Sequence, residues 1–256
     1  DKEALVNYLY YPIFVELTEP EALIYAKLTQ RIGWALAKNQ SWIDNDNLTS
    51  LLMQRSRLVG AAENKLNALR KLMLNRLNTY HTLFYCGDGS MDNYPADYRR
   101  QIEAVTHLLG TELGYRVNTY TAETTLEERE KIKEQFEKKE LQGLVAIRCL
   151  DEGVDIPSIQ TAVILASSGN PRQFIQRRGR ILRTHPQKKQ ATLFDMIVMP
   201  PELDRETWEV ERNLLRKELK RFVEFAQLAV NAKEAQESLG EILQRFGIND
   251  LGHGEN

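Results

Sequence analysis

The strongest chemical signal in this sequence is a cluster of basic side chains around residue 180. Between Arg172 and Lys189 the chain has seven lysines or arginines and no acidic residue. In a helix, Gln176, Arg180 and Arg183 would lie at i, i+4 and i+7 on one face. Arginine keeps its charge and donates bidentate hydrogen bonds to phosphate oxygens, so it can neutralise charge that develops during phosphoryl transfer. A solvated basic helix face is the alternative, and composition alone favours it.

The apolar residues of the same segment limit how far this helix can run. They would form the opposite helix face, but Arg178 would fall among them. We therefore expect the helix to end at Arg178, and Gly179 to let the chain turn. Arg180 and Arg183 would then project from a loop at the edge of the domain.

A second segment of chemical interest is the turn that follows the apolar run 144–147. Gly153 permits a close approach of the backbone, and Pro157 fixes the exit of the turn. Asp155 is a short acid that could accept hydrogen bonds from a ribose or from the arginines. An ordinary turn between a strand and a helix is the alternative, because Gly-x-Asp-x-Pro by itself is a weak motif. Its position upstream of the arginines, with one strand between them, favours a shared site.

Short apolar strands that alternate with helices would position both segments. The runs 144–147 and 162–165 lack polar alternation, which is typical of strands buried on both faces of a parallel sheet. This texture predicts an α/β fold with an open, mostly parallel sheet, helices on both faces, and functional residues at the carboxyl ends of the strands. Strands are predicted at 81–86, 116–120, 144–147, 161–166 and 191–198, and helices at 95–109, 125–139 and 171–178.

Helical segments flank the α/β region. We divide the chain into a helical accessory segment with an initial strand (1–60), an α/β lobe (61–200) and a C-terminal helical extension (201–256). Residues 1–60 could be an insertion between two lobes, a grip for nucleic acid, or plain packing. The tryptophans Trp34 and Trp42, near basic residues, could stack on bases. Core or surface packing is the more frequent role of such residues.

Composition indicates an ordinary globular protein. The net charge is −2, so the average gives no sign of a polyanionic partner. Cys86 and Cys149 lie in apolar runs and are expected to be buried, reduced thiols. No apolar stretch approaches the length of a membrane span, and no signal peptide is recognisable. We expect a fragment of a longer chain that is cytoplasmic, or associated with the nucleoid, in a prokaryote.

The two chemical segments together resemble the conserved motifs of superfamily-two helicases. Residues 176–183 read Gln-Arg-Arg-Gly-Arg-Ile-Leu-Arg and match motif VI, Gln-x-x-Gly-Arg-x-x-Arg, without a mismatch. Residues 152–157 resemble motif V at the expected distance upstream. The resemblance covers about residues 62–199 and includes the approach to motif IV (64–86) and the segment 120–124. Within this superfamily, the motifs are similar to those of helicases of the xeroderma-pigmentosum B type and of helicase subunits of restriction and phage-defence systems.

This resemblance implies a RecA-like second motor lobe and a role for each matching residue. Arg180 and Arg183 would be arginine fingers that reach the γ-phosphate of ATP bound on the other lobe, with Gln176 sensing the nucleotide. Gly153 and Asp155 would contact the ribose or couple motif V to motif VI. Contacts to nucleic acid are expected from Thr121, Arg148 and Arg172. The family often has Thr-Asp where Ile147-Arg148 stands here, so a charged contact would replace a hydroxyl contact.

The sequence also lacks half of an ATP site. It has no Gly-x-x-x-x-Gly-Lys-[Ser/Thr] phosphate loop and no Asp-Glu pair at the end of a buried strand to hold Mg²⁺. The resemblance therefore implies that ATP and Mg²⁺ are bound mainly by an N-terminal lobe of the full-length protein, and that this chain alone is inactive.

The leading hypothesis is the C-terminal lobe of an ATP-dependent DNA helicase or translocase, with repair, restriction and phage defence as candidate processes. A non-enzymatic α/β scaffold and an RNA helicase lobe are the alternatives. The intact arginine pair argues against the scaffold, because a scaffold has no need of both side chains. DEAD-box RNA helicases look more distant, because their motif VI usually begins with His where Gln176 stands.

Overall fold

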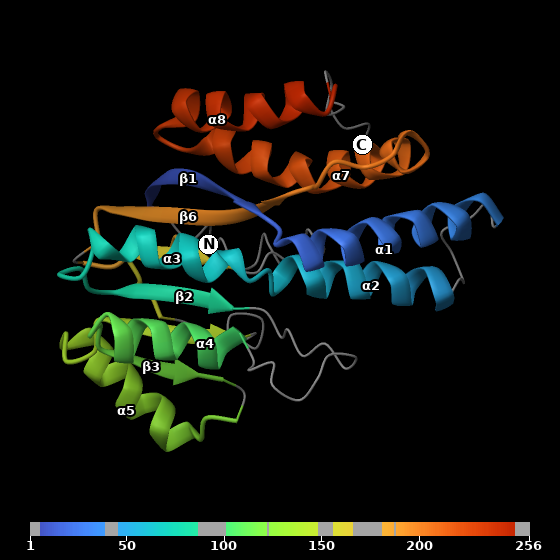
Figure 1. The fold of residues 1–256 in the computed structure, drawn as a ribbon. Coiled ribbons are helices and arrows are strands. Elements are labelled where there is room, and N and C mark those ends of the chain that lie inside the picture. Colours follow the sequence, from blue (N-terminus) through green and yellow to red (C-terminus); the bar gives the residue numbers. More distant parts are fainter. Residues whose placement is uncertain are drawn as a thin grey trace.

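The computed structural model describes residues 6–38, 46–86, 101–121, 123–147, 156–165, 181–186 and 188–248. Six strands form one sheet in the order β1-β6-β5-β2-β4-β3, and every neighbouring pair is parallel (Figure 1). The strands are β1 (Asn7–Glu16), β2 (Thr82–Cys86), β3 (Val117–Tyr120), β4 (Gly143–Ile147), β5 (Thr161–Ile164) and β6 (Gln190–Met199). The helices are α1 (Glu19–Lys38), α2 (Asp46–Gly60), α3 (Asn64–Leu74), α4 (Gln101–His107), α5 (Leu126–Glu137), α7 (Arg205–Leu228) and α8 (Ala232–Arg245).

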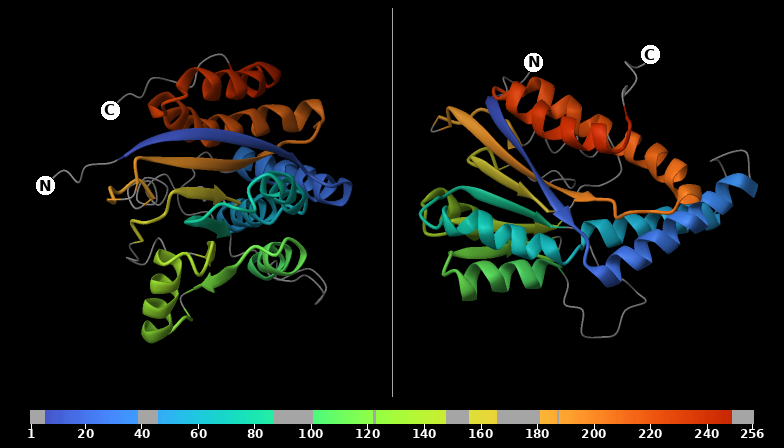
Figure 2. Two further views of the ribbon diagram at one scale, coloured as in Figure 1. Left: turned by 90° about the vertical axis from the view of Figure 1, so that its left-hand side faces the viewer. Right: turned by 45° about the horizontal axis from the view of Figure 1, so that its top comes forward.

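The predicted open α/β sheet with helices on both faces is confirmed. Along β2, Leu83 and Tyr85 join one buried cluster whereas Phe84 and Cys86 join the other, because successive side chains of a strand point to opposite faces. Helices α5, α7 and α8 cover the first face, and α3 and α4 cover the second (Figures 1 and 2). All five predicted strands are present, as are the described parts of the predicted helices 95–109 and 125–139. The predicted helix 171–178 lies outside the described residues.

The initial strand belongs to this sheet. β1 pairs with β6 over its whole length, from Asn7 beside Gln190 to Glu16 beside Met199. The first strand of the predicted segment 1–60 is therefore a strand of the lobe itself. The physical reason is that a parallel partner can be brought from anywhere in the chain, which the local pattern of the strand does not reveal. The division at residues 60 and 200 stays a prediction.

The outer edge of β1 is closed by the turn between α7 and α8. The side-chain amide of Asn231 donates to the Tyr10 carbonyl at 3.0 Å and accepts from the Tyr10 amide at 2.9 Å. The Val230 amide donates to the Tyr8 carbonyl at 2.8 Å. The C-terminal helices are thus attached to the sheet by backbone hydrogen bonds as well as by apolar packing.

Hydrogen bonds at the helix starts agree with the sequence. Thr125 caps α5 in a reciprocal capping box with Glu128, as the Thr-x-x-Glu spacing predicts. At the start of α1, Glu21 accepts from the Thr18 amide at 2.9 Å. Its second oxygen accepts from the amide of Glu63, just before α3, also at 2.9 Å. One buried carboxylate therefore ties the starts of two helices together.

Helices α1 and α2 form a hairpin that extends beyond the carboxyl ends of the strands (Figures 1 and 2). Their facing apolar residues form a separate small core, to which α7 contributes Leu214. Gly33 permits this close packing, because a Cβ atom there would lie 2.9 Å from Val210 Cγ2 of α7. Helix α7 therefore joins the hairpin to the sheet.

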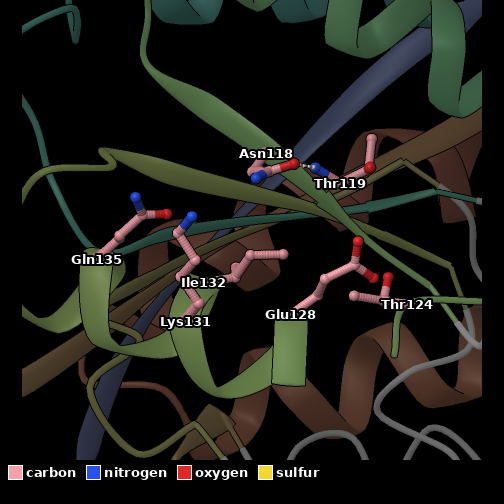
Figure 3. A pocket seen from close by; sticks show the side chains of 7 residues that line it. All are labelled: Asn118, Thr119, Thr124, Glu128, Lys131, Ile132 and Gln135. Atoms are coloured by element: carbon pink, nitrogen blue, oxygen red, sulfur yellow. Dashed lines mark hydrogen bonds between the residues drawn. The ribbon is translucent and has the colours of Figure 1, made fainter. Parts of the chain in front are cut away.

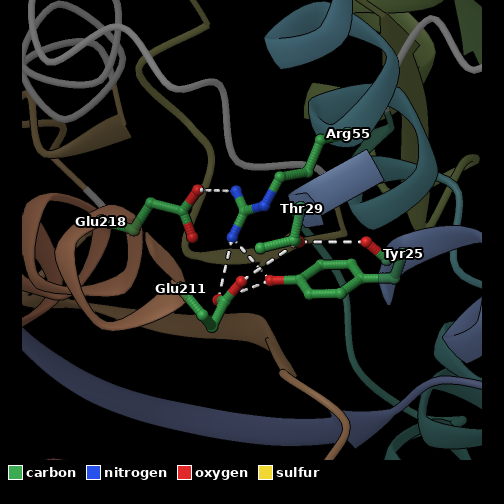
Figure 4. A network of polar contacts seen from close by, with 5 residues as sticks. All are labelled: Tyr25, Thr29, Arg55, Glu211 and Glu218. Carbon is green, nitrogen blue, oxygen red and sulfur yellow. Dashed lines mark hydrogen bonds and ion pairs between the residues drawn. The ribbon is translucent and has the colours of Figure 1, made fainter. Parts of the chain in front are cut away.

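A buried polar network fixes the same junction (Figure 4). Arg55 of α2 donates to Glu218 at 2.6 Å and to Glu211 at 3.1 Å, both on α7. It also donates to the Tyr25 hydroxyl at 2.5 Å, and that hydroxyl donates to Glu211 at 2.7 Å. The side chains of Arg55 and Glu211 are only 4% and 0% exposed. Burial raises the pKa of Glu211, and the Arg55 charge opposes this effect.

Replacing Arg55 with Met is expected to lower the free energy of unfolding by about 3–5 kcal/mol, because Glu211 would stay buried without its cation. Urea denaturation of wild type and variant measures this loss. Arg70→Met is the matched control, because Arg70 forms a pair of equal 2.6 Å length with Glu112 at 40% exposure. Solvent screening limits that pair to within ~1 kcal/mol. Equal losses in the two variants would contradict a specific role for the buried network.

The stability of the fold should depend on pH through the buried side chain of His81. It has φ 55, precedes β2, and packs edge-on against Phe136 of α5 with ring centroids 5.3 Å apart. Burial lowers the pKa of its imidazole below the ordinary value of 6.5. The unfolded chain therefore takes up a proton at a higher pH than the folded chain does, so the contribution of His81 to stability is full above pH ~6.5 and is lost at lower pH.

We expect His81→Asn to flatten this dependence. Asn tolerates the left-handed backbone and does not titrate. The free energy of unfolding, measured by urea denaturation at pH 7.5 and 5.5, should fall less in the variant than in wild type. An unchanged difference between the two pH values would show that His81 is not its source.

Candidate functional site

Most of the predicted site residues follow the carboxyl ends of the strands. Because all strands are parallel, these ends meet at one edge of the sheet, where open α/β proteins bind their ligands. Every strand of the sheet ends at this edge, so the segments that follow the strands begin there. Six of the eight residues predicted from sequence come from the segments after β4 and β5 and lie outside the described residues: Arg148, Gly153, Asp155, Arg172, Gln176 and Arg180.

Thr121 is described, and it lies at the expected edge directly after β3. Its amide donates to the Thr124 hydroxyl at 3.0 Å, and its carbonyl accepts from Arg129 Nη2 at 3.0 Å. The Arg129 guanidinium also lies over the Tyr120 ring, 5.5 Å from its centroid. The backbone of Thr121 is therefore held in a fixed turn, with the half-buried side chain next to the end of the strand.

Arg183 lies at the opposite edge. The carbonyl of its neighbour Leu182 accepts from the Val6 amide at 2.8 Å, just before β1 begins. The carbonyl of Ile181 accepts from Lys188, just before β6 begins. Arg183 is thus at the amino ends of these strands, because the chain has crossed back from the end of β5 to the start of β6. Arg183 therefore does not lie at the carboxyl edge, where the sequence led us to expect the site residues, and the structure does not bring Arg183 and Thr121 together.

A shallow polar hollow lies between β3 and α5 (Figure 3). Its lining is a mixture of amides, hydroxyls and both signs of charge: Asn118, Thr119, Thr124, Glu128, Lys131, Ile132 and Gln135. Glu128 is already engaged by Thr125, and these hydrogen bonds lower the pKa of its carboxyl. Cationic groups that could converge on a phosphate are limited to Lys131 in this lining. The hollow therefore has no arrangement suited to a nucleotide.

Lys65 lies near the carboxyl edge of the sheet, and the sequence analysis did not predict its role. It lies in the first turn of α3, is fully buried, and donates through Nζ to the Leu165 carbonyl and to the Gly60 carbonyl at 3.2 Å. Gln101 donates to the same Gly60 carbonyl at 2.8 Å. Leu165 directly follows β5 and precedes the segment that contains motif VI. Lys65 therefore fixes the start of that segment to the α2–α3 connection.

The signal for Lys65 was present in the pattern of α3. Lys65, Leu69 and Met73 recur every four residues and are the buried residues of this helix. A lysine in register with a core stripe indicates a buried cation with hydrogen-bond partners. The neighbouring Cys86 is buried as predicted, and burial raises the pKa of its thiol. Cys149 lies outside the described residues.

No metal centre occurs in the part of the chain that the structure describes, since it has no group of His, Cys, Asp or Glu side chains that could hold an ion. Within the same ranges, no helix is long and apolar enough to span a membrane.

Comparison with known proteins identifies the central part of the chain. Residues 64–185 match the family described as Helicase conserved C-terminal domain. Over this range the chain is similar to helicase C-terminal domains. The match begins at the first residue of α3 and ends after Arg183, so it includes Lys65, Thr121 and both motif segments. The resemblance to superfamily-two helicases is confirmed.

The chain is also similar to a protein named DNA 3'-5' translocase XPB2 from Sulfurisphaera tokodaii. The two are 37% identical over 93 residues, which is 34% of this chain and 21% of the relative. The matched part thus spans about a fifth of that relative's length.

Among solved structures, the C-terminal part of the Fun30 ATPase domain covers 95% of this chain and 99% of its own, with 13% identity and a TM-score of 0.49. The helicase domain of Pyrococcus furiosus Hef covers 76% and 56%, with 14% identity and a TM-score of 0.44. Because both TM-scores lie below 0.5, the assignment of the fold rests on the order and direction of the strands.

We expect Lys65→Met to lower the free energy of unfolding by about 1–3 kcal/mol, because the Leu165 carbonyl would lose this buried donor and the Gly60 carbonyl would keep only that of Gln101. Lys71→Met is the control on the same helix, since Lys71 is exposed, and its effect should stay within about 0.5 kcal/mol. Denaturant titration compares the two. If the Lys65 variant were as stable as the control, these hydrogen bonds would make no net contribution to the free energy of unfolding.

Proposed function

We propose that this chain is the C-terminal motor lobe of an ATP-dependent DNA helicase or translocase. The observation that carries the proposal is the unbroken motif VI, Gln176 to Arg183, inside the helicase C-terminal domain at residues 64–185. The open parallel sheet supports it as a lobe that a second lobe completes.

In this proposal the lobe supplies positive charge to a triphosphate held elsewhere. Arg183, with Arg180, donates hydrogen bonds to phosphate oxygens as charge develops during hydrolysis. ATP, with its Mg²⁺, supplies the free energy when it is bound by the N-terminal lobe. Closure of the two lobes would bring the arginines to the phosphate, and opening would release them.

DNA is proposed as the partner because the matched relative is named a DNA translocase and because the motifs resemble the same branch. RNA is the second candidate, and a scaffold without motor activity is the third. Stimulation of the full-length ATPase by duplex DNA, single-stranded DNA and RNA separates the first two candidates.

Replacement of Arg183 with Ala in the full-length protein separates motor from scaffold. We expect ATP turnover to fall by about 10³-fold or more, with binding of ATP changed much less, because an arginine finger acts mainly in the transition state. Arg183→Lys should stay impaired, because Lys lacks the planar fork. Arg70→Ala is the control for loss of one exposed arginine. Normal turnover in the Arg183→Ala variant would favour the scaffold.

A further inference from the structure

One face of α1 is exposed and has the side chains of a nucleic-acid contact. Leu23, Lys27, Arg31 and Trp34 follow each other at i, i+4, i+8 and i+11, which places them on one side of the helix. Leu23 is 61% exposed and Trp34 58%, and the two cations are also exposed. The other side of α1 is buried in the hairpin core through Tyr25, Leu28, Ile32 and Ala35. Packing in the core is therefore excluded as the role of Trp34.

The charge of this face is positive although the whole chain is slightly acidic. From Ala22 to Lys38 the helix has no acidic residue, and its two acids, Glu19 and Glu21, both lie in the first turn. Glu21 is buried and accepts hydrogen bonds from two backbone amides. The long part of the face thus presents cations, apolar surface and the neutral side chain of Gln30, and no acid. Such a surface is complementary to a polyanion that also has flat apolar groups.

The face is held rigidly and lies beyond the edge of the sheet. Gly33 lets α1 pack closely on Val210, and the Arg55 network fixes the hairpin to α7. The hairpin extends past the carboxyl ends of the strands (Figures 1 and 2).

We propose that the face of Leu23, Lys27, Arg31 and Trp34 binds single-stranded nucleic acid. Trp34 would stack on an unpaired base, Leu23 would contact a second base or a sugar, and the two cations would contact the phosphates between them. The aromatic residue favours a single strand over a duplex, because bases paired in a duplex do not offer their faces. The class of ligand rests on the proposed function, but the site is separate from motifs V and VI.

The direct test is the affinity of the full chain for a labelled oligothymidylate, measured by fluorescence anisotropy. Trp34→Ala should weaken binding roughly tenfold, because stacking contributes ~1–3 kcal/mol per base. Trp34→Phe should restore most of the affinity. Arg31→Ala should weaken binding and reduce the slope of log K against log salt by about 0.7. Leu126→Ala, which removes a residue that is 81% exposed on α5, should change nothing.

Three outcomes of the binding experiment would overturn the proposal. They are absence of binding by the wild-type chain, equal affinity of wild type and Trp34→Ala, and equal weakening of oligothymidylate and duplex binding by Trp34→Ala. A change in oligomeric state of the Trp34 variant on size-exclusion chromatography, with binding unchanged, would assign the face to a second copy of the chain and also overturn it. None of these affects the Arg183 experiment, so a failure here is distinguishable from a failure of the proposed function.

Discussion

The parallel pairing of β1 with β6 places the N-terminal helical hairpin and the C-terminal helices relative to the rest of the sheet. It brings residues 7–16 beside residues 190–199, the longest contact between distant parts of the described sequence. Because β1 runs parallel to the other strands, its carboxyl end meets the same edge as theirs, and α1 begins there. The α1–α2 hairpin, which is distant in sequence from the other strands, therefore begins at the carboxyl edge of the sheet.

Helix α7 connects the α1–α2 hairpin to the sheet. Its first half contacts the hairpin through Glu211, Leu214 and Glu218, and its last turns pack on β1 through Phe225. The Tyr8 hydroxyl donates to the Phe225 carbonyl at 2.8 Å, so the end of the helix is fixed to the strand. Apolar packing alone allows helices to slide, whereas a buried charge needs its partner at one position. The network around Arg55 therefore gives the hairpin a defined direction relative to the sheet.

The sequence predicted what depends on local pattern. The buried strands were recognisable from apolar runs such as Leu144–Ile147. The sequence did not predict what depends on distant partners, namely the place of β1 in the sheet and the partners of Arg55. Lys65 was detectable in principle from its register with Leu69, but its acceptors Gly60 and Leu165 were not.

Site residues were recognised by motif, which identifies residue types but not their positions in space. Arg183 illustrates the difference, because the return of the chain to the start of β6 carries it to the amino ends of the strands. The roles proposed for Gly153, Asp155, Gln176 and Arg180 rest on the same motif match, and so do those of Arg148 and Arg172. Of the two site residues that the structure describes, Thr121 lies directly after β3, at the carboxyl edge of the sheet.

The closure of β1 by Asn231 and Val230 has a consequence for solubility. A ten-residue outer strand with free amides and carbonyls is a template on which another chain can add a strand. The turn after α7 occupies that template at Tyr8 and Tyr10, and α7 and α8 lie over the adjoining apolar face. The C-terminal helices therefore protect the sheet from edge-to-edge aggregation. A fragment cut at residue 200 would retain the motif residues but would expose both the edge and the apolar face, and it would tend to associate with itself.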